Sequence, residues 1–290
     1  MDKAIRHIII TGDDFGSSHA VNQAIIQAHE RGILTSASLM VSGDAFEEAL
    51  DLAHQHPRLA VGLHLVLVSG RATLPRQRIP HLVDKNGWFS SNPFLAGALY
   101  QCHAAARREV RREIRAQLEK FQQTGLKLSH VDGHRHMHLP PFVLGTLIEL
   151  SPEFSIRAIR FPSEELSTAL AIDRNNFLEK SSLSFAFKTL GLRAKRRLRS
   201  AGIRCLDRVY GLLQSGRVTE DYLLQLIPQI RAGWVEIYSH PTIETNSHSL
   251  RGASGSQLAA LLSDRVRRAL VSHGFRLASY FDLNGCAISS

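Results

Sequence analysis

The chain has 290 residues, 44% of them hydrophobic, and carries a formal net charge of +9. This length and composition are sufficient for one large domain with a real core, and they exclude a largely disordered chain. The three cysteines, Cys102, Cys205 and Cys286, form no CxxC pair and indicate reduced thiols. No apolar run reaches the roughly 18 residues of a membrane span, and the run 8–10 is too short for a signal peptide, so we expect a cytoplasmic protein.

The first half of the chain alternates between strand-like and helix-like segments. We expect strands over residues 6–11, 36–41 and 59–68, and helices over 20–31, 45–54 and 104–124. Asp13 and Asp14 directly follow the first strand, and His64 lies late in the third. Between them and the long charged helix, residues 69–93 are rich in Pro, Gly and Asn, which predicts a loop.

The second half continues the alternation with one interruption. We expect strands over 125–130, 156–161, 234–239 and 276–281, and helices over 141–150 and 257–272. His134 follows the fourth strand, and His240 ends the sixth. Residues 162–207 break the rhythm and are interpreted as a basic helical insertion or lid, with a basic run at 188–199.

Strands that alternate with helices predict an α/β fold with a parallel sheet and right-handed crossovers. We count about seven strands and expect a single domain over 1–290 that fits an α/β barrel. In such barrels the reactive groups lie at the C-terminal ends of the strands. Asp13 and Asp14, His64, His134 and His240 come from four different elements, so we expect them to converge on one rim.

Polar side chains stand at alternate positions in one internal stretch: His130, Asp132, His134, His136 and His138. In an extended strand alternate side chains share one face, where a packed core would not accept them. A solvated histidine-rich turn is the plainer interpretation. A metal site is favoured because the tract is internal and follows a strand-like run.

One carboxylate and two neutral imidazoles suit Zn²⁺, Co²⁺, Mn²⁺ or Fe²⁺ with positions left open for water. Amide hydrolysis also needs a base, for which Asp13 is the candidate, and an acid, for which His240 is the candidate. The Asp pair alone is more typical of a turn or helix cap, and a lone histidine before proline is more often structural. The availability of His64 and His134, and the position of His240 at a strand end, favour the site. The other polar residues of the tract are candidates for substrate contact or for orienting a ligand, Asp132 by fixing an imidazole tautomer.

The chain resembles the YdjC-type carbohydrate deacetylases. The resemblance rests on motifs that lie in the same order along nearly the whole chain: residues 13–16, 32–38, 62–64, the tract 130–138 and the pair 240–241. It implies a distorted TIM-like barrel and one divalent cation, Mg²⁺ or Zn²⁺, held by Asp14, His64 and His134. It also implies that Asp13 is the base.

Within that family the chain is most similar to the hopanoid-biosynthesis-associated branch. The supporting segments are residues 62–68, 158–162, 202–204, 210–216 and 234–241. Arg160, in the segment 158–162, is a further candidate for substrate contact or for support of a metal ligand. This resemblance implies removal of acetyl from an N-acetylglucosaminyl group on a hopanoid glycolipid. Chito-oligosaccharides or other N-acetylated carbohydrates are the alternative substrates.

Two further alternatives belong to other classes. A metal-dependent phosphoesterase would need two metals roughly 4 Å apart, and the sequence offers few carboxylates to bridge them. A non-catalytic protein that binds nucleic acid or membranes would account for the basic charge, but no nucleic-acid motif is present and we expect no nucleic-acid partner. The run 188–199 is either a solvated surface helix or a peripheral contact with the inner membrane. The oligomeric state is left open.

Overall fold

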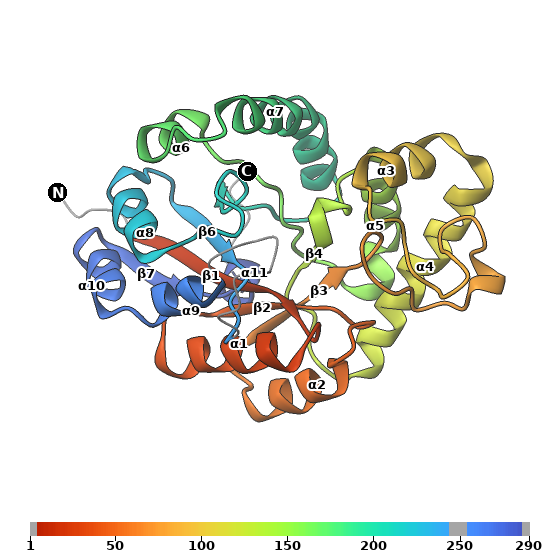
Figure 1. The fold of residues 1–290 in the computed structure, drawn as a ribbon, viewed down its shortest axis with the longest axis horizontal. Coiled ribbons are helices and arrows are strands. Elements are labelled where there is room, and N and C mark those ends of the chain that lie inside the picture. The colour runs from red at the N-terminus through yellow and green to blue at the C-terminus, as the bar shows by residue number, and fades with distance from the viewer. Residues whose placement is uncertain (1–4, 244–253, 286–290) are drawn as a thin grey trace.

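The computed structural model describes residues 5–243 and 254–285 and contains one parallel sheet (Figure 1). Its strands are β1 (Arg6–Phe15), β2 (Ser36–Leu39), β3 (Ala60–Leu65), β4 (Val131–Gly133), β5 (Arg208–Tyr210), β6 (Trp234–Ser239) and β7 (Phe275–Ala278). The order is β4-β3-β2-β1-β6-β5, and β7 pairs with the first residues of β1. The expected α/β class with about seven parallel strands is confirmed.

The gap between the two edge strands makes the barrel distorted. Residues 156–161 were expected to form a strand, but they contribute only isolated parallel bridges, from Val131 to Ile159 and from Ala158 to Arg204. The amide of Val131 donates to the Ala158 carbonyl at 3.0 Å, and the amide of Ile159 donates to the Arg204 carbonyl at 3.0 Å. The segment therefore spans the space between β4 and the residues that lead into β5. The strand that we did not expect is β5 itself.

The helices surround the sheet. They are α1 (His19–Arg31), α2 (Phe46–Gln55), α3 (Pro93–Cys102), α4 (Ala104–Gln123), α5 (Pro141–Phe154), α6 (Leu166–Ile172), α7 (Phe177–Ser200), α8 (Glu220–Leu226), α9 (Ser254–Leu262), α10 (Asp264–Ser272) and α11 (Tyr280–Gly285). Short 3₁₀ turns η1 (Arg76–Arg78), η2 (His134–His136) and η3 (Ile227–Gln229) complete the chain. The helix expected over 257–272 is divided, because the Ser263 hydroxyl accepts the amides of Arg265 and Val266 and caps α10.

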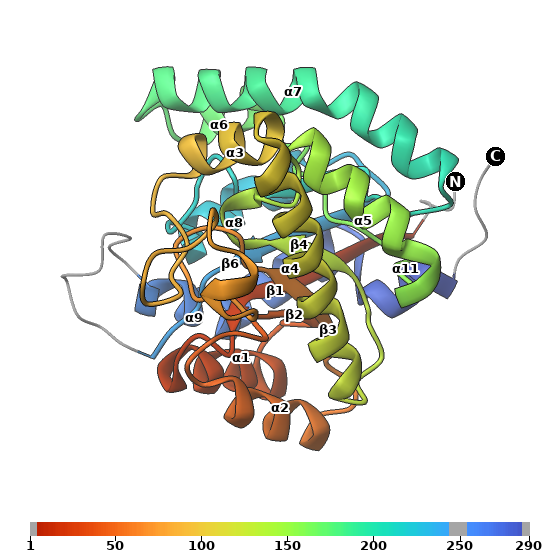
Figure 2. The same cartoon turned by 90° about the vertical axis from the view of Figure 1, so that its right-hand side faces the viewer.

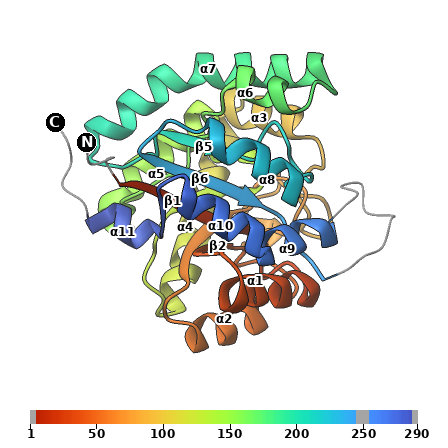
Figure 3. The ribbon, with the colours of Figure 1, turned by 90° about the vertical axis from the view of Figure 1, so that its left-hand side faces the viewer.

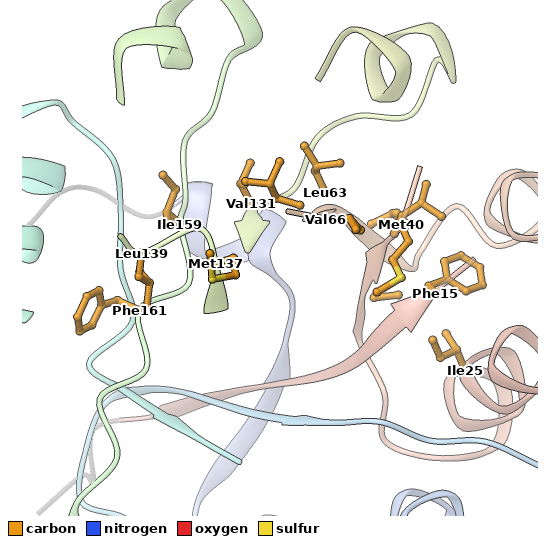
Figure 4. Close-up of a cluster of buried hydrophobic side chains, with 14 of the residues drawn as sticks. Phe15, Ile25, Met40, Leu63, Val66, Val131, Met137, Leu139, Ile159 and Phe161 are labelled. Carbon is orange, nitrogen blue, oxygen red and sulfur yellow. The ribbon is translucent and has the colours of Figure 1, made fainter. Parts of the chain in front are cut away.

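The core follows the periodicities of the sequence. In α4 the residues Val110, Ile114, Leu118 and Phe121 lie on one face and are buried, as their helical spacing predicts. Each such burial stabilises the fold by about 1.5–3 kcal/mol. Figure 4 shows buried side chains of this core from segments far apart in the sequence, with Met137 from the histidine tract among them.

The region 162–207 forms α6 and α7, and α7 crosses the top of the molecule above α3 and α6 (Figures 2 and 3). Its C-terminal half contains the basic run, but Ala194 and Leu198 on the same helix are buried. At the other end Lys180 forms an ion pair with Asp173 at 2.9 Å. The C-terminal half of α7 thus packs on the barrel core, and its N-terminal end is held to the end of α6. Among the described residues no helix is long and apolar enough to cross a membrane.

Candidate metal and catalytic site

A bulge near the end of β1 separates the adjacent carboxylates Asp13 and Asp14. The register between β1 and β2 shifts between Gly12 and Phe15, and Asp14 has a φ of 64°. This left-handed conformation costs a non-glycine residue about 1–2 kcal/mol, and bulges of this kind re-aim side chains beside active sites. The strand therefore continues through the pair, whereas we expected it to end at residue 11, and the two carboxylates have different partners.

Three side chains from three strands meet beside this bulge. Asp14 Oδ1 lies 2.9 Å from His134 Nδ1 and 3.3 Å from His64 Nε2. The three candidate ligand atoms all lie within 4.8 Å of one another. His64 belongs to β3 and His134 directly follows β4, so the convergence arises from neighbouring strand ends. Two imidazoles with one carboxylate form a donor set that suits Zn²⁺, Mn²⁺, Fe²⁺ or Co²⁺ better than Mg²⁺, which prefers oxygen.

The surroundings of His64 fit a bound cation. His64 Nδ1 lies 2.8 Å from Asp132 Oδ1, so Nδ1–H donates to this carboxylate and the lone pair of Nε2 faces Asp14. Nε2 is buried, and it forms no hydrogen bond within the described residues. Burial lowers the pKa of His64, but Asp132 and Asp14 outweigh it and raise that pKa to about 10. This pocket therefore requires a positive charge between the nitrogen and the carboxylates, from a proton or from a metal.

The ionised form of Asp14 is also strongly favoured. Burial raises the pKa of its carboxyl, yet His134 and His64 beside it, with His240 nearby, hold that pKa well below the usual range. The carboxylate is thus ionised at neutral pH and available as a ligand.

Arg160 lies at the centre of a buried network of three carboxylates. Its guanidinium donates to both oxygens of Asp13, at 2.7 and 2.9 Å, and to Glu236 at 2.8 Å. It also forms an ion pair with Asp132, the carboxylate that orients His64. Arg160 is 1% exposed. Because Asp13 and Asp132 share one guanidinium, the candidate base and the candidate ligand support are fixed relative to each other.

Glu236 is the member of this network that the sequence analysis missed. Its carboxylate accepts hydrogen bonds from Thr11 at 2.6 Å and Tyr280 at 2.7 Å, besides those from Arg160. Burial raises the pKa of Glu236 despite these donors. The clue in the sequence is a charged residue within the otherwise buried strand β6, because a buried charge requires a partner.

The histidine tract does not keep its alternation. β4 ends at Gly133, and Arg135 and His136 have φ values of 50° and 58°. Two successive left-handed residues turn the chain. The expectation that the five polar side chains share one face is therefore wrong. The run 125–129 is also not a strand, because β4 begins only at Val131.

His130 is a packed core residue. Its ring nitrogens lie 2.8 Å from Ser129 Oγ and 3.2 Å from Ser38 Oγ, and the ring stacks on Tyr280 with centroids 3.9 Å apart. Burial lowers the pKa of His130 to about 3. A Cβ atom at Gly62 would lie 2.4 Å from the ring, so glycine is required there.

The last two histidines of the tract lie around Arg160 rather than around Asp14. His138 Nε2 lies 2.8 Å from the Arg160 carbonyl, and His136 Nε2 lies 3.0 Å from the Tyr238 hydroxyl. The guanidinium of Arg160 lies over the Tyr238 ring, 4.6 Å from its centroid. Both histidines therefore support the walls of the site, and neither belongs to the Asp14 cluster.

His240 directly follows β6 at the same end of the sheet. Its amide donates to Gln257 Oε1 at 3.2 Å, and its carbonyl accepts from Gln257 Nε2 at 3.3 Å. These two hydrogen bonds fix the backbone while the imidazole lies close enough to Asp14 to lower the pKa of that carboxyl. The structure thus places the candidate acid near the candidate ligands.

Comparisons with known proteins show the family and the fold of the chain. The profile of the family described as YdjC-like protein matches residues 7–272. The chain belongs to the YdjC-like family. A solved protein of Enterococcus faecalis V583, described as a candidate cellobiose-phosphate cleavage protein, has a TM-score of 0.73 at 26% identity and covers 97% of this chain and 99% of its own. This YdjC-like chain therefore shares the fold of that protein over nearly all of the described residues.

Relatives of this YdjC-like protein are named carbohydrate deacetylase. The protein of Mus musculus is 31% identical over 305 residues, covering 96% of this chain and 94% of its own length. The protein of Brevibacillus brevis is 41% identical over 157 residues, which is 53% of this chain. The matched part spans 59% of the Brevibacillus brevis protein and 60% of the Geobacillus stearothermophilus protein. The chain thus spans about three fifths of the length of these two bacterial relatives.

Proposed function

We propose that this protein is a metal-dependent N-deacetylase of carbohydrates. The observation that carries the proposal is the convergence of Asp14, His64 and His134 beside the buried carboxylate of Asp13. The relatives named carbohydrate deacetylase support the same reaction class. One cation per chain is proposed, held by the two imidazoles and the Asp14 carboxylate.

A cation in this position would polarise the acetyl carbonyl and lower the pKa of a water molecule beside it. Asp13 removes the proton of that water as the oxygen attacks the carbonyl carbon. Each oxygen of Asp13 accepts one hydrogen bond from Arg160 and keeps a second lone pair for this proton. His240 donates a proton to the amine nitrogen as the C–N bond breaks, and acetate and the free amine are released.

The two-metal phosphoesterase is disfavoured by the same network. A second set of candidate ligands consists of Asp13, His64 and Asp132, and it shares His64 with the first. Both of its carboxylates already bind the guanidinium of Arg160. A second cation would have to displace this buried charge, so the geometry favours one metal.

The finer proposal is an N-acetylglucosaminyl group on a hopanoid glycolipid, which the sequence similarity of residues 158–162 and 234–241 supports. Chito-oligosaccharides are the alternative. A cytoplasmic location with peripheral contact at the inner membrane through residues 188–199 remains a prediction, and so does the absence of a nucleic-acid partner.

Acetate release tests the proposal. The protein is incubated with N-acetylglucosaminyl lipids and with chito-oligosaccharides, with and without a chelator. We expect acetate that depends on the metal and returns when Zn²⁺ is added back. Acetate release that a chelator leaves unchanged would overturn the role of the metal, and no release from either substrate class would overturn the deacetylase.

A further inference from the structure

A cavity of about 970 Å³ lies beneath α7, and we call it the α7 cavity. Its apolar wall combines Phe161, Leu166, Phe187, Leu212 and Leu213. A volume of this size is at the upper end of the range of small-molecule sites, which are mostly apolar with a few polar groups. Phe185, also in the lining, is 71% exposed. The cavity is thus large enough for a bulky apolar group.

The α7 cavity extends along α7, and one part of it lies at the same end of the barrel as the Asp14 cluster. Phe161 follows the segment that bridges to β4 in parallel, and Leu212 and Leu213 follow β5, so these residues come after C-terminal strand ends. This is the end at which β/α barrels bind their substrates. Figure 2 shows α7 crossing above this part of the molecule.

Ring contacts connect the cavity wall with the catalytic network. The Phe187 ring meets His136 edge-on with centroids 5.6 Å apart, and His136 Nε2 lies 3.0 Å from the Tyr238 hydroxyl. The guanidinium of Arg160 lies over the Tyr238 ring and donates hydrogen bonds to Asp13. These contacts join the wall of the α7 cavity to the residue that holds Asp13.

Long basic side chains complete the lining: Lys188, Lys195, Arg196 and Arg199. Among the described residues none of these four side chains forms an ion pair. Burial lowers the pKa of Lys195, whose ammonium lies 5.6 Å from the Phe161 ring centroid. Aliphatic stems of such residues extend apolar walls while their charged ends stay wet. Ser181 Oγ, also in the lining, is buried and has no hydrogen-bond partner in the part of the chain that the structure describes.

We propose that the α7 cavity binds the apolar aglycone of a glycoside whose N-acetyl sugar occupies the Asp14 cluster. This inference rests on the proposed function and names its substrate class, an amphiphilic N-acetylglycoside. The apolar wall holds the aglycone, and the ring contact of Phe187 with His136 lies on the side of the cavity that faces the catalytic network.

The test compares methyl and dodecyl β-N-acetylglucosaminides at concentrations below micelle formation. In the unsubstituted protein we expect kcat/KM for the dodecyl glycoside to exceed that for the methyl glycoside at least tenfold. Ser184→Trp fills the cavity from α7 and should bring the ratio close to one. Ser182→Trp is the matched control, because Ser182 is exposed on the same helix outside the lining, and it should keep the ratio. Equal kcat/KM for both glycosides in the unsubstituted protein would overturn the inference while leaving deacetylation intact.

A binding measurement tests the α7 cavity independently of the deacetylase activity. Dodecyl β-glucoside has no acetamide, so calorimetry with this probe reports on the cavity whether or not the protein is a deacetylase. We expect binding by the unsubstituted protein and by Ser182→Trp, and at least tenfold weaker binding by Ser184→Trp. Ser181→Trp provides a second filled cavity if Ser184→Trp does not fold. Absence of binding, or equal binding by the filled variants, contradicts the inference.

Discussion

The inside of the barrel and the α7 cavity differ in whether their charged side chains form ion pairs. Inside, Arg160 is 1% exposed and binds three carboxylates, so each buried charge has a partner. In the cavity, Lys188, Arg196 and Arg199 have no ion pair within the described residues, and the wall is apolar. The first arrangement fixes the positions of reacting groups, whereas the second leaves room for a ligand. The proposals above place the chemistry in the barrel and the choice of substrate at α7.

The largest expected effect compares an arginine from each region. Arg160→Gln leaves three buried carboxylates without their cation and should lower the free energy of unfolding by about 3–5 kcal/mol. Arg208→Gln breaks the half-exposed pair with Glu165 at the cavity and should lower it by about 0–1 kcal/mol. Urea denaturation at pH 7 measures both. Equal losses for the two variants would remove the distinction between the regions.

The strand ends explain which part of the site was predictable. Asp14, His64 and His134 converge because parallel strands deliver their C-terminal ends to one edge, and this follows from the order of the elements. The network around Arg160 was not predictable, because Arg160 meets Asp13 across 147 positions of the sequence and from a segment that forms no regular strand. Such a contact depends on how the barrel curls.

Local backbone conformation accounts for the other errors. The alternation of the tract predicts that its five polar side chains share one face, but nothing in the residue types reveals that Arg135 and His136 adopt left-handed conformations. β5 has only three residues, too few for a period to be recognised. Long helices with a repeated apolar face, such as α4, were predicted nearly to their ends.

The next largest expected effect is the contribution of Glu164 to the pH dependence of stability. Burial raises the pKa of this carboxyl, which lines the α7 cavity, from 4.5 to about 7. The folded state therefore holds the proton more tightly than the unfolded state, and stability falls as pH rises from about 4.5 to about 7, by at most about 3 kcal/mol. Glu164→Gln can still accept the amides of Gly211 and Leu213, and it lacks this loss.

Thermal or urea denaturation at pH 5 and pH 8 measures this difference. From pH 5 to pH 8, the free energy of unfolding of Glu164→Gln should increase relative to that of the unsubstituted protein. The difference between Glu47→Gln, a change at an exposed position, and the unsubstituted protein should stay constant. A variant that runs parallel to the unsubstituted protein at both pH values contradicts a buried, protonated carboxyl at the cavity.

Asp13→Asn tests the barrel as the place of chemistry. The amide cannot take the proton of the attacking water, so turnover should fall about a hundredfold, equivalent to about 2.7 kcal/mol. The variant should still bind one metal ion, because Asp13 lies outside the Asp14, His64 and His134 set. Acetate release and metal content are measured on the same preparation, with Asp221→Asn at an exposed position as the control. Full activity in Asp13→Asn would rule out its role as the base.

The most direct test of the central claim is the metal stoichiometry of two histidine variants from the same tract. After equilibrium dialysis against Zn²⁺, elemental analysis should give one ion per chain for the unsubstituted protein and for His138→Ala, whose imidazole contacts the Arg160 carbonyl. His134→Ala should retain no tightly bound ion, because its imidazole faces Asp14. Two ions per chain, or one ion retained in His134→Ala, would contradict the proposed metal site.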